Sequence, residues 1–247
     1  MNGGSRREVR LVGPSGMPRH ELLDWPEPGA GVVAGVAGGP APWDFRLARG
    51  DGAVPAWTAL LRDLGGFVQV VGSRQVHGSN IGRHARSEDG VHVAEAADGH
   101  ATTAPGILLV VTVADCVPVF LASRAGRALA LLHAGWRGVA AGIVERGLQT
   151  MTELSGTPPS DIVMHCGIGI CGNCYEVGPE VHRALGSARE GMLDLRAVIM
   201  NRARVLGLET ASASPWCTAH DAGDFQSHRR SQGSDGRMAA YLGWSAA

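Results

Sequence analysis

Hydrophobic residues are densest in the middle of the chain, where three short apolar runs follow one another. They cover Ile107 to Val113, Val117 to Ala122 and Ala128 to Leu132. Each run is short, rich in aliphatic residues and bounded by turn signals, a pattern typical of buried β-strands. Cys116 lies between the first two runs, and His133 follows the third. We therefore expect a rigid sheet to present a thiol and an imidazole at its edge.

The spacing of apolar residues predicts further elements on both sides of this segment. Strands are expected at 31–36, 67–71, 91–94 and 162–164, and helices at 56–64, 138–154, from 178 onward and at 193–206. Residues 1–30 are rich in Gly, Pro and Arg without periodicity, which predicts a loose N-terminal arm, and residues 38–55 are loop-like. With no repeat or linker, residues 31–247 are predicted to form a single domain.

Composition narrows the class of protein. A chain of 247 residues with 45% hydrophobic residues and a mean hydropathy of +0.02 is typical of a soluble globular protein with a full core. No apolar run approaches the roughly 20 residues of a membrane span, and no signal peptide is recognisable. The net charge of −1 argues against nucleic-acid binding. We expect a cytoplasmic protein whose five cysteines are reduced thiols.

The absence of lysine restricts the chemistry. All 22 basic residues are arginine, which excludes a Schiff-base lysine, a phosphate-binding lysine of the Walker type and a Ser-Lys dyad. Anions must then be bound by arginine side chains, backbone N–H groups or helix N-termini. Arg137, Arg229 and Arg230 lie at loop ends and are candidates for bidentate phosphate binding, unless they are solvated or structural.

Three residues at the ends of apolar runs form the first candidate site. His77, Cys116 and His133 offer two imidazoles and one thiol, a donor set that suits zinc and leaves a fourth position open for water or substrate. The same thiol and imidazole can instead act as a nucleophile and its base. Each histidine can also be an ordinary structural residue. Spacing alone leaves these three interpretations open.

Three further features carry candidate chemistry. The turn from Gly167 to Ile170 is either a close backbone approach to a ligand or simply a tight turn. Cys171 and Cys174 form a CxxC pair that fits structural thiols, a dithiol redox pair or part of a site edge. Asp115 can act as a general base, orient a metal ligand or cap the end of a strand.

The motifs together resemble the laccase-domain family, also described as polyphenol oxidases, multifunctional purine nucleoside phosphorylases or peptidoglycan editing factors. The similarity covers roughly residues 31 to 244. The motifs that carry it, in chain order, are Gln75-Val76-His77-Gly78, Ala114-Asp115-Cys116-Val117-Pro118, His133-Ala134-Gly135-Trp136-Arg137-Gly138, Cys174-Tyr175-Glu176-Val177 and Ser227-His228-Arg229-Arg230. The chain departs from the family pattern at Ile168 and at residues 171–173, which leaves its substrate preference open.

The resemblance implies an α+β fold, a single-domain four-layer αββα sandwich with mixed β-sheets. It also implies one Zn²⁺ held by His77, Cys116 and His133, with copper the less favoured metal. The implied reactions are phosphorolysis of adenosine, inosine and methylthioadenosine and hydrolytic deamination of adenosine. Purine nucleoside and phosphate are then the partners, with no nucleic acid or membrane, and the protein is a monomer or homodimer.

Further roles are predicted for individual residues if the protein has the implied activity. Zinc would acidify a water that attacks the purine ring, and Arg137 would hold the phosphate that attacks the sugar. Asp115 is the candidate proton donor, and the predicted catalytic residues are Asp115, Cys116 and Arg137. Substrate binding is assigned to Gln75, Gly167, Arg229 and Arg230. The alternatives are a cysteine hydrolase that edits peptidoglycan precursors, a copper-dependent polyphenol oxidase and a zinc-stabilised binding module.

Overall fold

Two β-sheets form the centre of the molecule. The computed structural model describes residues 8–27, 30–39, 42–46, 54–86, 89–125, 127–221 and 223–245. The first sheet has seven strands, in spatial order β1 (Glu8–Val12), β2 (Pro18–Leu22), β3 (Val32–Ala37), β15 (Met238–Trp244), β8 (Ile107–Val113), β4 (Gln69–Ser73) and β6 (Gly90–Ala94). Its pairs are antiparallel except where β4 pairs in parallel with β6 and β8.

The second sheet lies against the first. Its six strands, in spatial order, are β14 (Thr210–Ala213), β11 (Ile162–Cys166), β9 (Val117–Ser123), β10 (Leu129–Ala134), β7 (Gly99–Thr102) and β5 (Ile81–His84). The outer pairs β11·β14 and β5·β7 are parallel, so this sheet is also mixed. A separate short ribbon consists of β12 (Glu176–Val177) and β13 (Gly191–Met192).

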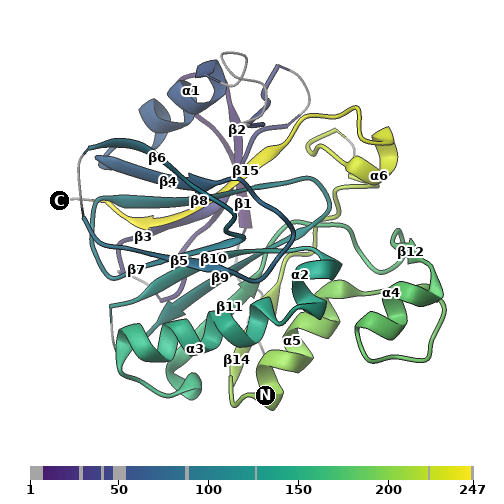
Figure 1. Cartoon of the computed structure of the whole chain (residues 1–247). Helices are drawn as coiled ribbons and strands as arrows, with labels where there is room; N and C mark the ends of the chain where they lie inside the picture. Colours follow the sequence, from purple (N-terminus) through teal and green to yellow (C-terminus); the bar gives the residue numbers. More distant parts are fainter. Residues whose placement is uncertain are drawn as a thin grey trace.

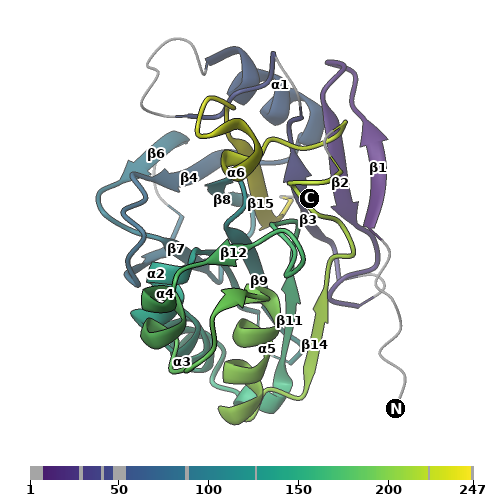
Figure 2. The ribbon, with the colours of Figure 1, turned by 90° about the vertical axis from the view of Figure 1, so that its right-hand side faces the viewer.

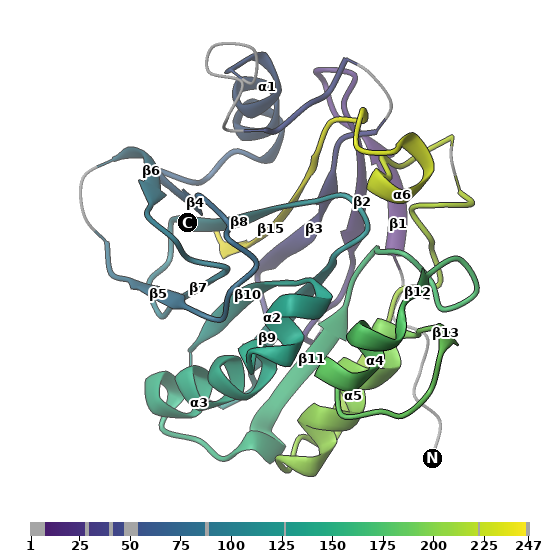
Figure 3. The ribbon, with the colours of Figure 1, turned by 45° about the vertical axis from the view of Figure 1, so that its right-hand side comes forward.

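Helices cover the outer faces of both sheets. The helices of the described residues are α1 (Val54–Leu64), α2 (Trp136–Ala140), α3 (Ile143–Ser155), α4 (Pro179–Ala184), α5 (Leu195–Val205) and α6 (His228–Ser231), with a 3-10 turn at Pro159–Asp161. Helix α1 packs on the first sheet, whereas α3 and α5 pack on the second. Figures 1 and 3 show the resulting order of helix, sheet, sheet and helix. The predicted four-layer αββα sandwich is confirmed.

The central strands are apolar at every position because both of their faces are buried. In β8, Leu108 and Val110 belong to the core cluster that includes α1, while Leu109 and Val111 belong to the one that includes the second sheet. In β9, Leu121 faces the helices on the other side of the molecule. Each fully buried aliphatic side chain contributes about 1.5–3 kcal/mol. The turns that leave this rigid centre therefore hold their side chains in fixed positions.

Most of the predicted elements are present, with two corrections. The expected loose arm is wrong for residues 8–22, which form the antiparallel hairpin β1–β2 at the edge of the first sheet (Figure 2). Backbone pairing defines this edge hairpin, so periodicity does not reveal it. The single helix predicted at 138–154 is two helices, because Gly142 between them has a φ of +87°.

The described residues do not fully test the predicted loop or the predicted single domain. The loop predicted at 38–55 lies partly outside the described residues, since 40–41 and 47–53 are not among them. The single domain over residues 31–247 stays a prediction. None of the helices in the described ranges combines the length and the apolar character that crossing a membrane requires.

Candidate functional site

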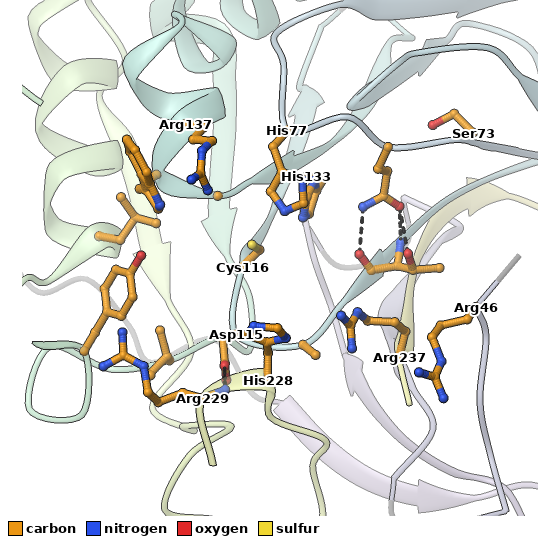
Figure 4. A pocket seen from close by; sticks show the side chains of 18 of the residues that line it. Arg46, Ser73, His77, Asp115, Cys116, His133, Arg137, His228, Arg229 and Arg237 are labelled. Atoms are coloured by element: carbon orange, nitrogen blue, oxygen red, sulfur yellow. Dashed lines mark hydrogen bonds between the residues drawn. The ribbon is translucent and has the colours of Figure 1, made fainter. Parts of the chain in front are cut away.

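Three side chains from separate parts of the chain converge at one edge of the sheets. Cys116 lies in the turn between β8 and β9, and His133 is near the end of β10. The register between β9 and β10 places His133 opposite Pro118, close to that turn. His77 enters from the loop after β4. The ligand atoms of the three residues all lie within 4.8 Å of one another, and Figure 4 shows both imidazoles directed toward the Cys116 sulfur.

The backbone is strained at two positions of this site. His77 and Asp115 have φ values of 59° and 84°, in the left-handed region that residues other than glycine rarely adopt. Such conformations cost on the order of 1–3 kcal/mol each and persist only where surrounding contacts enforce them. Around His77 the enforcing group is Asp98. Its carboxylate accepts the backbone N–H groups of Val76, His77 and Gly78 at 3.1, 2.9 and 2.8 Å.

Asp98 also orients the second imidazole. His133 Nδ1–H donates to the Asp98 carboxylate at 2.9 Å, which leaves Nε2 to face the thiol. Burial opposes the ionised form of Asp98, but the hydrogen bond from His133 and those from the backbone outweigh it and lower the pKa of this carboxyl. No sequence pattern points to Asp98, because it belongs to no motif and its partners Gly78 and His133 lie 20 and 35 residues away.

Cys116 and His133 stabilise each other as an ion pair. Burial disfavours the thiolate, but the charge of His133 and hydrogen bonds from both histidines outweigh it and lower the pKa of Cys116 to about 6. Burial likewise disfavours the imidazolium. The Cys116 thiolate and Asp98 reverse that effect and raise the pKa of His133 to about 9. The thiol is therefore ready to act as a metal ligand or a nucleophile at neutral pH.

The donor set fits a metal ion. Two imidazole nitrogens and one thiolate within 4.8 Å of one another are ligands that zinc and related metals accept. Space around the thiol is tight on the side of Gly135, where a methyl group would lie 2.9 Å from the Cys116 Sγ. Three ligands leave a fourth coordination position, and all three residues line a cavity of about 600 Å³. The cluster can thus bind a metal ion that remains accessible to a small molecule.

The cavity is positively charged and partly aromatic. Apart from the three donors, its lining includes Arg46, Ser73, Arg74, Gln75, Thr112, Ala114, Asp115, Gly135, Trp136, Arg137, Ile170, Tyr175, Leu195, His228, Arg229 and Arg237. Asp115 is the only carboxylate among these described lining residues, against five arginines. In Figure 4, Arg137 and Arg229 lie on one side of Cys116, and Arg46 and Arg237 on the other. This distribution of charge favours an anionic ligand.

Two aromatic side chains line one wall of the cavity. The Arg137 guanidinium lies 4.3 Å from the centre of the Trp136 ring, and that of Arg229 lies 5.2 Å from the Tyr175 ring. Both rings are half-buried. Burial and, next, the Cys116 thiolate raise the pKa of Tyr175 to about 12, so its hydroxyl stays protonated and can donate. Flat rings beside arginines suit a ligand that has both a planar and an anionic part.

The carboxylate of Asp115 is engaged in holding the C-terminal segment. It accepts the hydroxyls of Thr218 and Ser227 at 2.5 and 2.7 Å and the backbone N–H of Arg229 at 2.6 Å. The Asp115 carbonyl accepts the N–H of Ile170 at 2.9 Å. Asp115 therefore positions the loops around the cavity, and a role in proton transfer would require it to release one of these bonds.

The other residues predicted to bind substrate fall into two groups. Gln75 and Arg229 line the cavity, although the Gln75 side chain already bonds with the backbone of Thr112 at 2.7 and 2.8 Å. Gly167 and Arg230 are not among the described lining residues. Gly167 packs closely against β9, and the Arg230 guanidinium donates to the carbonyls of Thr218 and Phe225. Tyr175, His228 and Arg237 line the cavity without having been assigned roles.

Comparison with known proteins agrees with the motifs. Residues 51–245 match the family model described as multi-copper polyphenol oxidoreductase laccase. The chain is 34% identical over 187 residues to purine nucleoside phosphorylase ORF3 of Streptomyces griseus, covering 70% of this chain and 73% of that protein. It is 36% identical over 185 residues to purine nucleoside phosphorylase SCO2081 of Streptomyces coelicolor, covering 70% and 74% of the two chains.

A solved structure extends the agreement to the fold. The crystal structure of YlmD from Geobacillus stearothermophilus superposes with a TM-score of 0.85 and 27% sequence identity, covering 96% of this chain and 99% of that one. The resemblance carried by the short motifs thus holds over most of the chain. The protein belongs to the multi-copper polyphenol oxidoreductase laccase family.

Proposed function

We propose that the protein is a zinc-dependent purine nucleoside phosphorylase. The observation that carries the proposal is the opening of the His77, Cys116 and His133 cluster onto a cavity lined by arginines and two aromatic rings. Such a cavity suits a purine nucleoside together with phosphate. The relatives named purine nucleoside phosphorylase support the same activity. We further propose adenosine, inosine and methylthioadenosine as phosphorolysis substrates, and hydrolytic deamination as a second reaction on adenosine.

Each part of the site has a role in this proposal. Zn²⁺ bound by His77, Cys116 and His133 would supply Lewis-acid polarisation and an acidified water. Arg137 and Arg229, which line the cavity, would hold phosphate, whose oxygen would attack the anomeric carbon as the bond from that carbon to the base nitrogen breaks. Trp136 and Tyr175, which also line the cavity, would stack on the purine and exclude water from it.

Phosphate-dependent release of adenine from adenosine tests the proposal. We expect the zinc-loaded enzyme to form adenine and ribose 1-phosphate only when phosphate is present. Arg137→Ala should raise the KM for phosphate about 10-fold or more, since a charge-assisted bond contributes about 1.5–3 kcal/mol. Arg204→Ala, at an exposed position on α5 outside the cavity lining, is the matched control. Zinc-loaded enzyme without phosphorolysis on any of the three nucleosides would refute the assignment.

One observation favours a cysteine hydrolase as a second candidate. Cys116, His133 and Asp98 form a hydrogen-bonded series in which the thiol has a lowered pKa, the arrangement of a nucleophile, its base and an orienting carboxylate. Such an enzyme tolerates complete removal of metal by a chelator and is inactivated when the thiol is alkylated in the metal-free state. The proposed phosphorylase instead loses turnover on chelation and regains it when Zn²⁺ is returned.

A further inference from the structure

Two loops each present a pair of potential metal ligands, and none of these four residues is among the described residues that line the cavity. Cys171 and Cys174 are separated by two residues, and so are Cys217 and His220. The CxxC pair therefore has a partner of the same spacing, in which a histidine takes the place of the second cysteine. All four ligand atoms lie within 4.8 Å of one another.

The loops are held together by backbone contacts. Gly169 and Cys217 form an isolated parallel β-bridge, and Thr218 N–H donates to the Gly169 carbonyl at 3.2 Å. Next to this bridge, the side chains of the four potential ligands lie close together. His220 Nδ1 lies 3.3 Å from the Cys174 Sγ and 3.7 Å from the Cys171 Sγ, and Cys171 N–H donates to the Cys217 Sγ at 3.3 Å.

We propose that Cys171, Cys174, Cys217 and His220 bind a structural zinc ion, separate from the cluster in the cavity. Three thiolates and one imidazole are a donor set of closed tetrahedral zinc sites, and two pairs with two-residue spacing match the usual arrangement of such ligands. Cys217 is buried, Cys171 and Cys174 are half-buried and His220 is exposed. The ion would therefore be screened on the protein side and reachable from solvent for loading.

A neighbouring carboxylate supports the orientation of the histidine. The Asp221 carboxylate lies 3.7 Å from His220 Nε2 and accepts the Cys217 N–H at 2.8 Å. Histidines that bind metals commonly direct their second nitrogen toward a carboxylate, which fixes the ring and favours metal binding by the first. Here Nδ1 is the nitrogen on the side of the thiols.

The proposed ion would stabilise one wall of the cavity. Thr218, next to Cys217, donates its hydroxyl to Asp115, the residue before Cys116. Ile170 and Tyr175, which flank the CxxC pair, line the cavity. Binding of zinc would join the two loops that carry these contacts. Its role is structural, since four protein ligands leave no position for substrate.

The proposal is tested by measuring how many zinc ions the full chain binds. The protein is purified under reducing conditions and supplied with Zn²⁺. We expect wild type to hold two zinc ions, Cys116→Ala one, and Cys171→Ser/Cys174→Ser one. Cys166→Ala, which removes a buried cysteine outside the cluster, is the matched control and should hold two. Since Cys116→Ala lacks a ligand of the cavity cluster, its remaining zinc reports on the second cluster whether or not nucleosides are substrates.

Cobalt provides a second measurement that depends on no variant of the loops. Co²⁺ bound to Cys116→Ala should give the intense near-ultraviolet thiolate-to-metal band and the visible bands of a tetrahedral site with three thiolates. A folded Cys116→Ala protein that retains neither zinc nor this cobalt spectrum would overturn the proposal. So would an intact mass showing that two of these cysteines form a disulfide in the reduced, zinc-supplied protein.

Discussion

The two clusters of cysteine and histidine use the same residue types but differ in the number of metal ligands and in their access to the cavity. The cavity cluster has three donors from three distant segments and opens onto a space of about 600 Å³. The second cluster has four donors from two adjacent loops, none of them among the described lining residues. Three donors leave a coordination position for a reacting molecule, whereas four close the site. The count of donors thus separates a catalytic from a structural role.

The two clusters also differ in backbone strain, which is present at the cavity cluster and absent from the described residues of the second. At the cavity cluster, His77 and Asp115 have left-handed backbone conformations. Both carboxylate oxygens of Asp98 accept backbone N–H groups from His77 and its neighbours and so hold His77 in this conformation. Among the described residues of the two loops, 171–174 and 217–220, no residue other than glycine has a positive φ. Strain retained at the cavity cluster is typical of a functional site. The second cluster follows from ordinary turns.

The largest expected difference is in turnover. Cys116→Ala should lower kcat/KM for adenosine phosphorolysis by about 10³-fold, because Lewis-acid stabilisation of several kcal/mol is lost and each 1.36 kcal/mol is a factor of ten. His220→Ala should keep turnover at 25 °C while lowering Tm, since each kcal/mol of lost stability corresponds to about 2–4 °C in a chain of this size. If both variants lost turnover equally when compared at the same zinc content, the assignment of a catalytic role to one cluster and a structural role to the other would be wrong.

The sequence predicts the cavity cluster better than its surroundings. Physical reasoning placed Cys116 and His133 at the ends of buried strands, and register then brings them together. Spacing alone left the roles of His77, Cys116 and His133 open, and the family resemblance supplied the metal-binding interpretation. Asp98 was missed because a carboxylate becomes recognisable only once its backbone partners are folded around it. Gly167 was predicted from its glycine-spaced turn and Arg230 from its motif, and neither signal shows which way a residue faces.

The second cluster and the edge strands show a different limit. The CxxC spacing alone does not indicate a four-ligand metal site, since the partner pair is Cys217 and His220 and its proximity depends on the bridge at Gly169. The hairpin β1–β2 was missed because β1 is only half-buried, β2 buries the polar residues Arg19 and His20, and the two strands pair through the backbone. The central strands were predicted well because burial on both faces leaves a continuous apolar run.

An effect of intermediate size on zinc affinity is expected from the carboxylates of Asp98 and Asp221, each of which lies beside one histidine of its cluster. Asp98→Asn should weaken zinc binding at the cavity cluster by about 10–100-fold, the usual cost of losing the group that orients a metal-binding histidine. Asp221→Asn should weaken the second cluster by less, because its carboxylate lies 3.7 Å from His220 whereas Asp98 lies 2.9 Å from His133. Competition with a chromogenic chelator measures both affinities. Each variant should leave the zinc affinity of the other cluster unchanged. Weaker binding at both clusters in either variant would contradict the proposal that they are independent sites.

The smallest expected effect is the pH dependence of the metal-free fold. The pKa of Cys116 is lowered to about 6 from an ordinary 9.0, so its contribution to stability is full above pH 9.0 and is lost as pH falls through about 6. The pKa of His133 is raised to about 9 from 6.5, so its contribution is full below pH 6.5 and is lost as pH rises through about 9. Both shifts describe one thiolate–imidazolium pair, which therefore stabilises the fold between about pH 6 and about pH 9.

Calorimetry on chelator-treated wild type and Cys116→Ala isolates this contribution. The second cluster is emptied in both proteins, so it cancels in the difference between their Tm values. That difference should be greatest between about pH 6 and about pH 9 and should shrink on either side. A difference that is constant from pH 5 to pH 10 would show that Cys116 and His133 form no ion pair without metal. Cys171→Ser/Cys174→Ser, which leaves Cys116 and His133 intact, should retain the pH profile of wild type.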